Sequence, residues 1–572
     1  MSGEPTSALL ARGAHAPSAL AAATLCEAFQ CTAAEHSERV ALRTPDDSTS
    51  ISWEQYAHRV QRIAAGLAAL GVEPGETVGI MLVNRPEFNL IDTAALHLGA
   101  TPFSIYNSST AEQVAYLLKN AANHVLATEQ RFLPAITEAM AAGGSVEHVV
   151  IVDGEPDGTI SLGALESIGD PAFDFEAAWR RVGPEDVATL IYTSGTTGPP
   201  KGVQLTHGGL MAQIRAMHDR LRASPGGRIT SFLPSAHIAD RWSHHYQCSI
   251  GLGFTVTCIA DPQTVVAHLP AIKPTAWGSV PRVWEKIRAA LEAQGITNPA
   301  SLPEEQRAAI RAKLGLDQAE WLAVGGAPSP PDLLRYFADL GLELCELLGM
   351  SETSCTITCN PPGRAKIGTC GPVIDGVELE LADDGELLVR GAMVMSGYRN
   401  APDKTAEAID ADGWLHTGDI AQIDAEGYVT VIDRKKELII NAAGKNMSPA
   451  NIEAALKSAH PLIGQAVAIG DRRPYNVALI VLDPDVAAAF AQEHGIQDAS
   501  SRRLAGHEHV QEIVAGAVAE ANTQLARIEQ IKRHTILPCD WAPGGEELTP
   551  TMKLRRKPIA EKYAAEIDAL YA

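Results

Sequence analysis

TSGTTGPPKG, residues 193–202, is the most informative stretch of this 572-residue sequence. Four of its ten residues carry a hydroxyl group, three are glycines, and Lys201 follows two prolines. Glycines let backbone N–H groups approach phosphate oxygens, hydroxyls add further donors, and the lysine adds a positive charge. The apolar residues LIY at 190–192 place the loop after a strand. The stretch therefore predicts a phosphate-binding loop.

This loop is not of the Walker type. A Walker loop needs Gly-Lys-Ser/Thr at the start of a helix. Lys201 instead stands between Pro200 and Gly202. On composition alone, a Ser/Thr/Gly-rich turn without a ligand remains open as an alternative.

Composition indicates a globular, multidomain protein. The chain is longer than one hydrophobic core usually organises, and 46% of its residues are hydrophobic and 20% charged. No apolar run reaches the roughly 18 residues that a membrane span needs, and the first thirty residues lack the features of a signal peptide. Nine scattered cysteines do not form a disulfide framework or a zinc pattern. We therefore expect reduced thiols, a cytoplasmic location and at most peripheral membrane contact.

The charge is distributed unevenly along the chain. Residues 433–572 hold 17 Lys/Arg and 18 Asp/Glu, whereas the preceding 432 residues carry a net charge of −22. An acidic main body argues against binding to nucleic acid. The basic cluster KLRRK at 553–557 is either a solvated surface or a source of positive charge for an anionic ligand.

Early segments alternate between helix and strand patterns. SWEQ at 52–55 has the Ser and Gln of a capping box, and apolar residues follow at helical spacing up to Gly71. VGIMLV at 78–83 is typical of a buried parallel strand. This alternation continues to about residue 370 and predicts wound parallel sheets.

The pattern changes after residue 370. Residues 377–391 alternate on both sides of a DDG turn, and a second hairpin turns at 424–427, so a small β subdomain is expected. An α/β pattern then returns for a last domain of ordinary size, 433–572, after a body of residues 1–432. The predicted fold class is α/β. It has an N-terminal body of two wound α/β subdomains and a small β subdomain, followed by a small mobile C-terminal α/β domain.

Five further motifs follow the 193–202 loop in the sequence, namely GGAP (325–328), LGMSET (348–353), DGWLHTGD (412–419), DRKKELI (433–439) and TPTMKLRR (549–556). Together with the loop, and in this order, they resemble the adenylate-forming (ANL) superfamily. That superfamily includes acyl-CoA synthetases, luciferases and the adenylation domains of peptide synthetases. The long-chain fatty-acyl-CoA synthetase branch is the most similar one, because of the DGWLHTGD and DRKKELI motifs together with VPRVWEKI at 280–287.

The resemblance implies a reaction in two steps. A fatty acid attacks ATP with the help of Mg²⁺ to form an acyl-adenylate and pyrophosphate, and coenzyme A then takes the acyl group and releases AMP. It implies small-molecule partners only, namely the fatty acid, ATP and CoA, and a monomer or a homodimer. Two alternatives stay open among enzymes: loading of a carrier protein, and ligation of a medium-chain or aryl acid. A third, a binding protein without catalysis, would be expected to lack Glu352 or Lys553, and both are present.

The resemblance also implies roles for individual residues. Lys553 matches the catalytic lysine of the last domain, Glu352 and Thr196 the Mg²⁺-binding pair, and His237 the residue that gates the acyl tunnel. Without the family, His237 is equally a hydrogen-bonded polar histidine. Nucleotide contacts are implied for Thr193, Ser194, Gly195, Thr197, Gly198, Lys201, Gly326, Ala327, Pro328, Leu348, Gly349, Met350, Ser351, Asp419 and Arg434. Lys436 matches the hinge position, and Gly444 and Lys445 lie in the loop that faces CoA.

The chain departs from the family pattern at three places. Leu348 replaces the usual aromatic residue against adenine, and Met552 stands where many relatives have glycine. LPSAHIAD at 233–240 lacks the aspartate that amino-acid-activating members use for an α-ammonium group. The third departure predicts a substrate without an amine.

Overall fold

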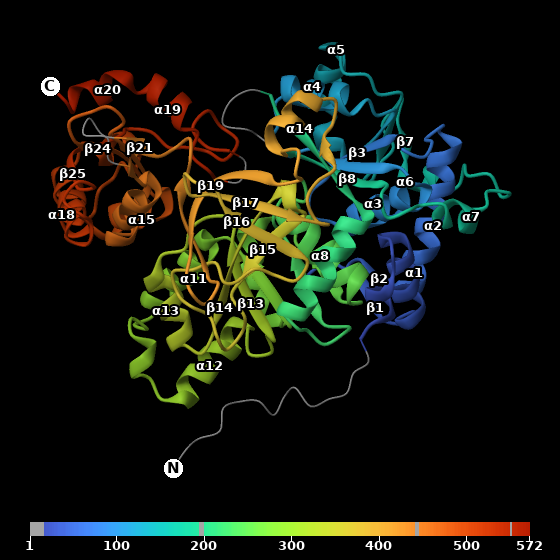
Figure 1. Cartoon of the computed structure of the whole chain (residues 1–572), viewed down its shortest axis with the longest axis horizontal. Coiled ribbons are helices and arrows are strands. Elements are labelled where there is room, and N and C mark those ends of the chain that lie inside the picture. The colour runs from blue at the N-terminus through green and yellow to red at the C-terminus, as the bar shows by residue number, and fades with distance from the viewer. Residues whose placement is uncertain (1–15, 194–198, 441–445, 550–551) are drawn as a thin grey trace.

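The computed structural model describes residues 16–193, 199–440, 446–549 and 552–572. The larger sheets lie in a large body, and the C-terminal helices and strands, with two smaller sheets, gather at one end of it (Figure 1). The predicted α/β fold is confirmed. In the described ranges, no helix combines the length and the apolar character needed to cross a bilayer.

The first wound unit is an eight-stranded sheet. Its central strands run parallel, while β9 and β18 are antiparallel at one end. Helices α2 and α3 pack on one face, and α4 and α5 pack on the other. In spatial order the strands are β18 (Gly397–Tyr398), β9 (Lys201–Thr206), β8 (Val187–Thr193), β4 (Thr101–Ser104), β3 (Thr77–Met81), β5 (Val125–Thr128), β6 (His148–Ile151) and β7 (Ile160–Ser161).

The second wound unit consists of two four-stranded sheets, where the sequence predicted simply a second wound subdomain. The Thr275 N–H donates to the Arg228 carbonyl oxygen at 2.9 Å and links the two sheets at their edges. One sheet is β10 (Arg228–Ser231), β11 (Thr255–Cys258), β1 (Val40–Arg43) and β2 (Ser50–Ser52). The other is β12 (Ala276–Ser279), β13 (Trp321–Gly325), β14 (Leu344–Met350) and β15 (Cys355–Cys359).

The predicted β subdomain is confirmed as an antiparallel four-stranded sheet. Both predicted hairpins are present in it, β16–β17 and β19–β20. Strand β20 continues to Arg434, two residues past the predicted 432/433 boundary, and the division into domains stays a prediction. The strands are β16 (Val377–Leu381), β17 (Glu386–Gly391), β19 (Leu415–Ile423) and β20 (Val429–Arg434).

The C-terminal part has a two-stranded and a three-stranded sheet. The three-stranded sheet carries one apolar cluster on each face, with α15 and α18 on one side and α19 and α20 on the other. The strands are β21 (Ile439–Ile440), β22 (Asn446–Met447), β23 (Ile463–Ile469), β24 (Asn476–Leu482) and β25 (Ile531–Ile536).

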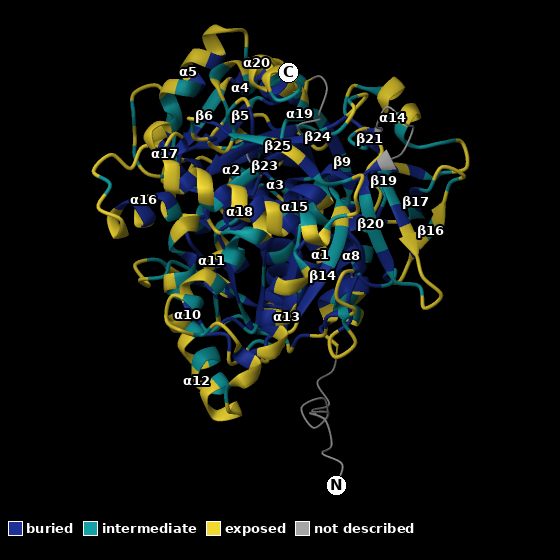
Figure 2. Ribbon diagram, turned by 90° about the vertical axis from the view of Figure 1, so that its left-hand side faces the viewer, coloured by how far each residue is buried: buried dark blue, intermediate teal, exposed yellow. Residues whose placement is uncertain are grey.

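The helices follow the expected local signals. The predicted capping box is confirmed, because the Gln55 N–H donates to Ser52 Oγ and the Ser52 N–H donates to Gln55 Oε1. Buried residues concentrate in the sheets and the helices beside them (Figure 2). The larger helices are α1 (Leu25–Glu35), α2 (Trp53–Ala69), α3 (Pro86–Leu98), α4 (Ala111–Ala121), α5 (Leu133–Ala141), α8 (His207–Arg220), α10 (Val265–Ile272), α11 (Pro281–Glu292), α12 (Glu304–Leu314), α13 (Pro331–Asp339), α15 (Pro449–Ala459), α16 (Pro484–Glu493) and α18 (Glu508–Gln524). Shorter ones that matter below are α6 (Leu162–Leu165), α7 (Phe175–Arg180), α9 (Ile238–Asp240), the π-helix η4 (Arg241–Gly251), η7 (Ser351–Thr353), α14 (Pro402–Ala408), α17 (Ser501–Ala505), α19 (Arg556–Lys562) and α20 (Ala564–Ala569).

Candidate active site

The predicted phosphate loop connects two antiparallel strands. Strand β8 ends at Thr193, which pairs with Lys201 at the start of β9. The predicted strand before the loop is confirmed, and Lys201 begins a strand rather than a helix, as a non-Walker loop requires. Ser194, Gly195, Thr196, Thr197 and Gly198 lie outside the described residues.

Tyr398 joins Lys201 to Glu352. Its buried hydroxyl donates to Glu352 Oε1 at 2.8 Å, and the Lys201 ammonium lies 4.0 Å from the centre of its ring. This cation–π contact and the hydrogen bond hold a positive and a negative group on the same side chain. The pKa of Lys201 is lowered by partial burial, and the nearby Glu352 carboxylate only partly opposes this shift. Sequence reasoning missed Tyr398, because GYRN at 397–400 has no spacing that ties it to Glu352.

The GGAP and LGMSET motifs lie at the carboxyl edge of neighbouring parallel strands. Gly326, Ala327 and Pro328 are exposed directly after β13, and Glu352 follows β14. The crevice beyond the carboxyl ends of parallel strands is where open α/β sheets bind ligands. Both motifs therefore lie at the edge where sheets of this kind usually bind ligands.

Gly349 is required for the turn inside LGMSET. A Cβ atom there would lie 1.5 Å from the Cys355 carbonyl oxygen, so only glycine allows this approach of β15 to β14. Leu348 beside it pairs with Thr358, Met350 is partly buried, and Ser351 is buried at the start of η7. The backbone of the motif is thus held in place by its pairing with β15.

Asp419 and Arg434 face each other across β19 and β20. The two residues are paired in register, and Arg434 Nε lies 2.8 Å from Asp419 Oδ1. Arg434 Nη1 also donates to the Thr417 carbonyl oxygen at 3.1 Å. Burial raises the pKa of Asp419, while Arg434 and Lys553 oppose that rise. The predicted association of Asp419 with Arg434 is present in the structure.

Lys553 reaches this site from the C-terminal part. Lys553 is exposed by surface area. The protein atoms around its ammonium group still lower its pKa by desolvation, and the Arg434 charge lowers it further. Asp419 and Glu352 act in the opposite direction on the Lys553 pKa, and Lys553 in turn lowers the pKa of His237. Four predicted site residues from distant motifs, His237, Glu352, Asp419 and Arg434, thus interact electrostatically with Lys553.

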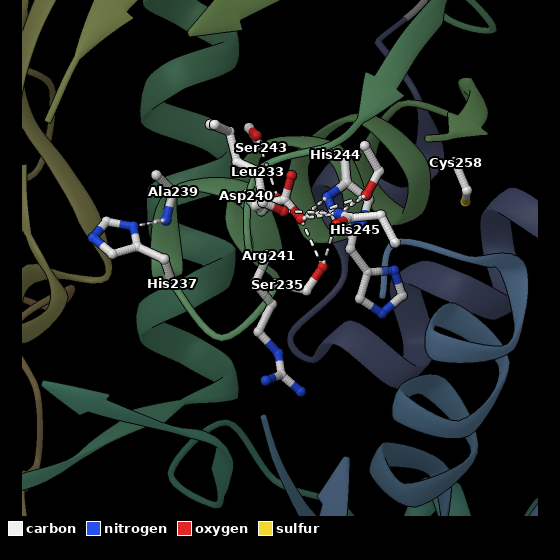
Figure 3. A network of polar contacts seen from close by, with 12 residues as sticks. Leu233, Ser235, His237, Ala239, Asp240, Arg241, Ser243, His244, His245 and Cys258 are labelled. Carbon is white, nitrogen blue, oxygen red and sulfur yellow. Dashed lines mark hydrogen bonds and ion pairs between the residues drawn. The ribbon is translucent and has the colours of Figure 1, made fainter. Parts of the chain in front are cut away.

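His237 begins the segment that leads into η4. The Ala239 N–H donates to His237 Nδ1 at 3.1 Å, which makes His237 the N-cap of α9 and leaves Nε2 to carry the ring proton (Figure 3). Burial lowers the pKa of His237 to about 4, so the ring is neutral near pH 7. A neutral ring with a fixed tautomer suits the wall of an apolar tunnel, the place that the family resemblance implies for His237.

A buried polar network supports η4 from behind. Arg241 forms an ion pair with Asp92 of α3, and both side chains are fully buried. Arg241 also donates to Tyr246 Oη at 2.9 Å and to Ser104 Oγ at 3.1 Å, while His245 Nε2 lies 3.0 Å from Asp92 Oδ1. Burial lowers the pKa of His245 well below its usual value, so its ring is neutral. The network ties η4, and with it His237, to the first wound unit.

The predicted hinge residue lies between two anchored neighbours. Lys435 Nζ lies 2.5 Å from Asp384 and 2.9 Å from Glu386 of the β subdomain. Glu437 instead lies 3.0 Å from Arg556, which belongs to the C-terminal part. Lys436 between them is exposed. Gly444 and Lys445 lie outside the described residues.

The described donor set fits a nucleotide and a hard cation. Glu352 uses Oε1 for Tyr398, and within the described ranges no hydrogen bond to Oε2 is present. An isolated carboxylate beside phosphate is a usual ligand of Mg²⁺, which keeps several waters and takes one or two carboxylates. Within the same ranges, no group of three or more His, Cys, Asp or Glu side chains forms an all-protein metal site. The nine cysteines are unpaired in the structure.

Two family models match the chain. Residues 29–399 match the AMP-binding enzyme model, and residues 436–572 match the model of the AMP-binding enzyme C-terminal domain. Among solved structures, the anthranilate CoA ligase AuaEII bound to anthranoyl-AMP covers 94% of this chain and 97% of its own, with a TM-score of 0.74 and 20% identity. The A-PCP didomain of carboxylic acid reductase from Segniliparus rugosus, bound to AMP, has a TM-score of 0.76 at 20% identity and covers 96% of this chain and 82% of its own. At such identities these structures establish the fold alone.

Curated relatives are closer in sequence. The "Putative fatty-acid--CoA ligase fadD11" of Mycobacterium tuberculosis is 48% identical over 453 residues, 73% of this chain and 79% of that protein. The "Long-chain-fatty-acid--CoA ligase FadD15" of Mycobacterium bovis is 35% identical over 568 residues, 91% of this chain and 92% of that protein. The "Long-chain-fatty-acid--CoA ligase ACSBG2" of Xenopus laevis is 30% identical and covers 96% of this chain and 84% of its own. With the site geometry, these matches show that the chain belongs to the AMP-binding enzyme family, the adenylate-forming superfamily that its motifs resemble.

Proposed function

We propose that the protein joins a fatty acid to coenzyme A at the expense of ATP, through an acyl-adenylate. The observation that carries this proposal is the proximity of Lys553 to the Asp419–Arg434 ion pair and to Glu352. Three relatives that cover most of this chain bear the name fatty-acid–CoA ligase, which favours a fatty acid over other carboxylates.

In the first half-reaction, a carboxylate oxygen attacks the α-phosphorus of ATP and pyrophosphate leaves. Negative charge crowds around the phosphorus as the two anions approach. Lys553 is proposed to neutralise that charge, because a preorganised cation acts most strongly where charge develops in a water-poor cleft. Asp419 accepts the ribose hydroxyls and Arg434 fixes Asp419, so that the nucleotide is held in one orientation.

The phosphates are proposed to lie along the 193–201 loop. Thr193, Ser194, Thr196 and Thr197 supply hydroxyl donors, Gly195 and Gly198 allow backbone approach, and Lys201 adds charge. Glu352 and Thr196 would hold Mg²⁺, which supplies neutralisation of the phosphate charge when it is bound. Gly326, Ala327, Pro328, Leu348, Gly349, Met350 and Ser351 would enclose the adenine and the α-phosphate.

In the second half-reaction, the CoA thiol attacks the acyl carbonyl carbon and AMP leaves. Lys553 and CoA cannot both occupy the same side of that carbon. We therefore assign residues 1–432 to the body and 433–572 to a mobile domain that turns about Lys436. The turn would replace Lys553 with the loop of Gly444 and Lys445. The anchored Lys435 and Glu437 on either side of the exposed Lys436 support a pivot at this residue.

Lys436→Pro should separate the two half-reactions. Proline fixes φ near −65° and removes an N–H, so it restricts the rotation that a hinge needs. We expect substantial adenylate formation and a loss of CoA transfer from supplied acyl-adenylate on the order of tenfold or more. Lys436→Ala is the matched control and should be nearly silent. Equal loss in both half-reactions would indicate misfolding, and intact CoA transfer in the proline variant would refute the hinge.

Glu352→Gln should raise the Mg²⁺ requirement of adenylate formation. The amide oxygen still accepts the Tyr398 hydroxyl, so the side chain keeps its position while its charge is lost. We expect a rate lower by about tenfold at low Mg²⁺, partly restored at high Mg²⁺, because the cation loses a charged ligand. A Mg²⁺ titration of pyrophosphate release measures the effect. An active Gln variant with an unchanged Mg²⁺ midpoint would argue against a ligand role.

Pyrophosphate release with a fatty acid, with and without CoA, tests the proposed function. Release that leads to a CoA thioester supports it. Release without any thioester favours loading of a carrier protein, and release with aryl or medium-chain acids only would move the assignment to those acids. The cytoplasmic location and the monomer or homodimer stay predictions.

A further inference from the structure

Helix α11 of the body and the start of α16 in the C-terminal part carry opposite charges that face each other. Arg282 Nη2 pairs with Asp483 Oδ2, and Lys286 Nζ lies 3.1 Å from Asp485 Oδ2. The two cations are one helical turn apart on α11, and the two acids flank the first residue of α16. Figure 2 shows the two helices on the same side of the molecule. We call these four residues the α11–α16 latch.

Asp483 both caps its own helix, α16, and pairs with Arg282 of α11. Its Oδ1 accepts the N–H groups of Asp485 and Val486 at 3.1 Å each and so caps α16. Its Oδ2 is thereby aimed at Arg282, and the side chain is only 7% exposed. Because the cap fixes the carboxylate before the ion pair forms, little side-chain entropy is lost when the two parts meet.

A second contact lies on another side of the C-terminal part. Gly544, with φ of +79°, approaches Ser108 in the loop after β4 so closely that a Cβ atom there would lie 2.8 Å from Ser108 Oγ. The loop that carries Lys553 follows nine residues later in the chain. The C-terminal part therefore meets the body at the latch, at Gly544 and around Lys553.

Long-range attraction does not account for this arrangement. The body of residues 1–432 carries a net charge of −22 and residues 433–572 carry −1, so the overall fields do not draw the two parts together. Pairing of one arginine and one lysine with two aspartates is a local interaction that acts only at short range.

We propose that the α11–α16 latch holds the C-terminal part in the arrangement that places Lys553 beside Asp419 and Glu352, and that it must open before CoA transfer. The latch residues are positioning residues: none touches the reacting atoms, and they act through the placement of Lys553. This inference rests on the proposed two-step function. It predicts that weakening the latch slows adenylate formation while CoA transfer is unchanged or faster.

Charge reversal at the exposed pair tests the latch. Lys286 and Asp485 are 55% and 76% exposed, so substitutions there should not disturb folding. We expect Lys286→Glu and Asp485→Lys each to slow adenylate formation by about threefold to tenfold, since an ion pair becomes a repulsion. The double variant restores the pair with reversed charges and should recover most of the rate. Arg335→Glu, at an exposed ion pair within α13, is the matched control and should leave the rate unchanged.

Small-angle X-ray scattering provides a readout that does not depend on activity. Each single charge reversal should shift the scattering profile away from that of the wild-type protein, and the double reversal should restore it. Adding Arg282→Gln to Lys286→Glu should enlarge the shift. Unchanged scattering and unchanged adenylation in the single variants, or failure of the double variant to restore them, would overturn the latch. If the wild-type protein activates no carboxylic acid, the proposed function fails, while scattering still decides whether the latch holds the two parts together.

Discussion

Lys553→Ala should abolish most adenylate formation while CoA transfer from supplied acyl-adenylate is largely kept. The expected loss is about 10²–10³-fold, the scale found when one preorganised electrostatic group is removed from an active site. The structure gives the physical reason, because Lys553 lies within electrostatic reach of Asp419, Arg434 and Glu352 and its pKa is lowered by desolvation. Its charge therefore lies near the groups proposed to hold the nucleotide and can act on the developing anion.

The control for Lys553 comes from the same basic cluster. Lys557 is four residues away, its side chain is 72% exposed, and it pairs with Glu561 on α19. Lys557→Ala should change neither half-reaction. Separate measurements of pyrophosphate release and of thioester formation decide the assignment. Adenylate formation near the normal rate in Lys553→Ala would show that the lysine has no catalytic role.

Asp92→Ala should destabilise the body by about 3–5 kcal/mol, the cost of removing one partner from a buried ion pair. The variant leaves the fully buried Arg241 guanidinium without its carboxylate and removes the acceptor of His245. Because this network supports η4 behind His237, the variant should also impair activity with long acids. The shift of the urea unfolding midpoint, followed by tryptophan fluorescence, measures the loss.

Two further variants define the interpretation of that loss. Combined Asp92→Leu and Arg241→Met replaces the pair by apolar side chains and should recover much of the stability, as such replacements often do. Removal of the exposed pair Arg180–Glu176, in which the side chains are 61% and 68% exposed, should cost less than about 1 kcal/mol. A loss below about 1 kcal/mol for Asp92→Ala would mean that the network does not support the fold.

Local signals in the sequence predicted the fold class and many of its elements. The Ser52–Gln55 capping box, the hairpin at 377–391 and the strand before the 193–202 loop all depend on residues close together in the chain. Motif order brought Asp419 and Arg434 into one proposed site, and the structure pairs them because β19 and β20 are consecutive strands in one sheet. Such local patterns predict structure because the residues that form the contact are close together in the sequence.

Long-range pairing was beyond the sequence. Tyr398 and Glu352 are 46 residues apart, and Asp92 and Arg241 are 149 apart, so no periodicity connects them. Strand β1 pairs with β11 across more than two hundred residues, which is why the second wound unit could not be divided into its two sheets in advance. The latch depends on how two parts of the chain dock, and each of its residues alone is typical of a surface charge.

Thioester formation across a series of acids tests the central claim most directly. The purified protein is supplied with ATP, Mg²⁺ and CoA and with saturated acids from acetate to very long chains, and products are identified by mass spectrometry. The account predicts acyl-CoA, AMP and pyrophosphate in equal amounts with long-chain acids and no acyl-CoA with Lys553→Ala. Acyl-adenylate or pyrophosphate without acyl-CoA from any fatty acid in the series would contradict it.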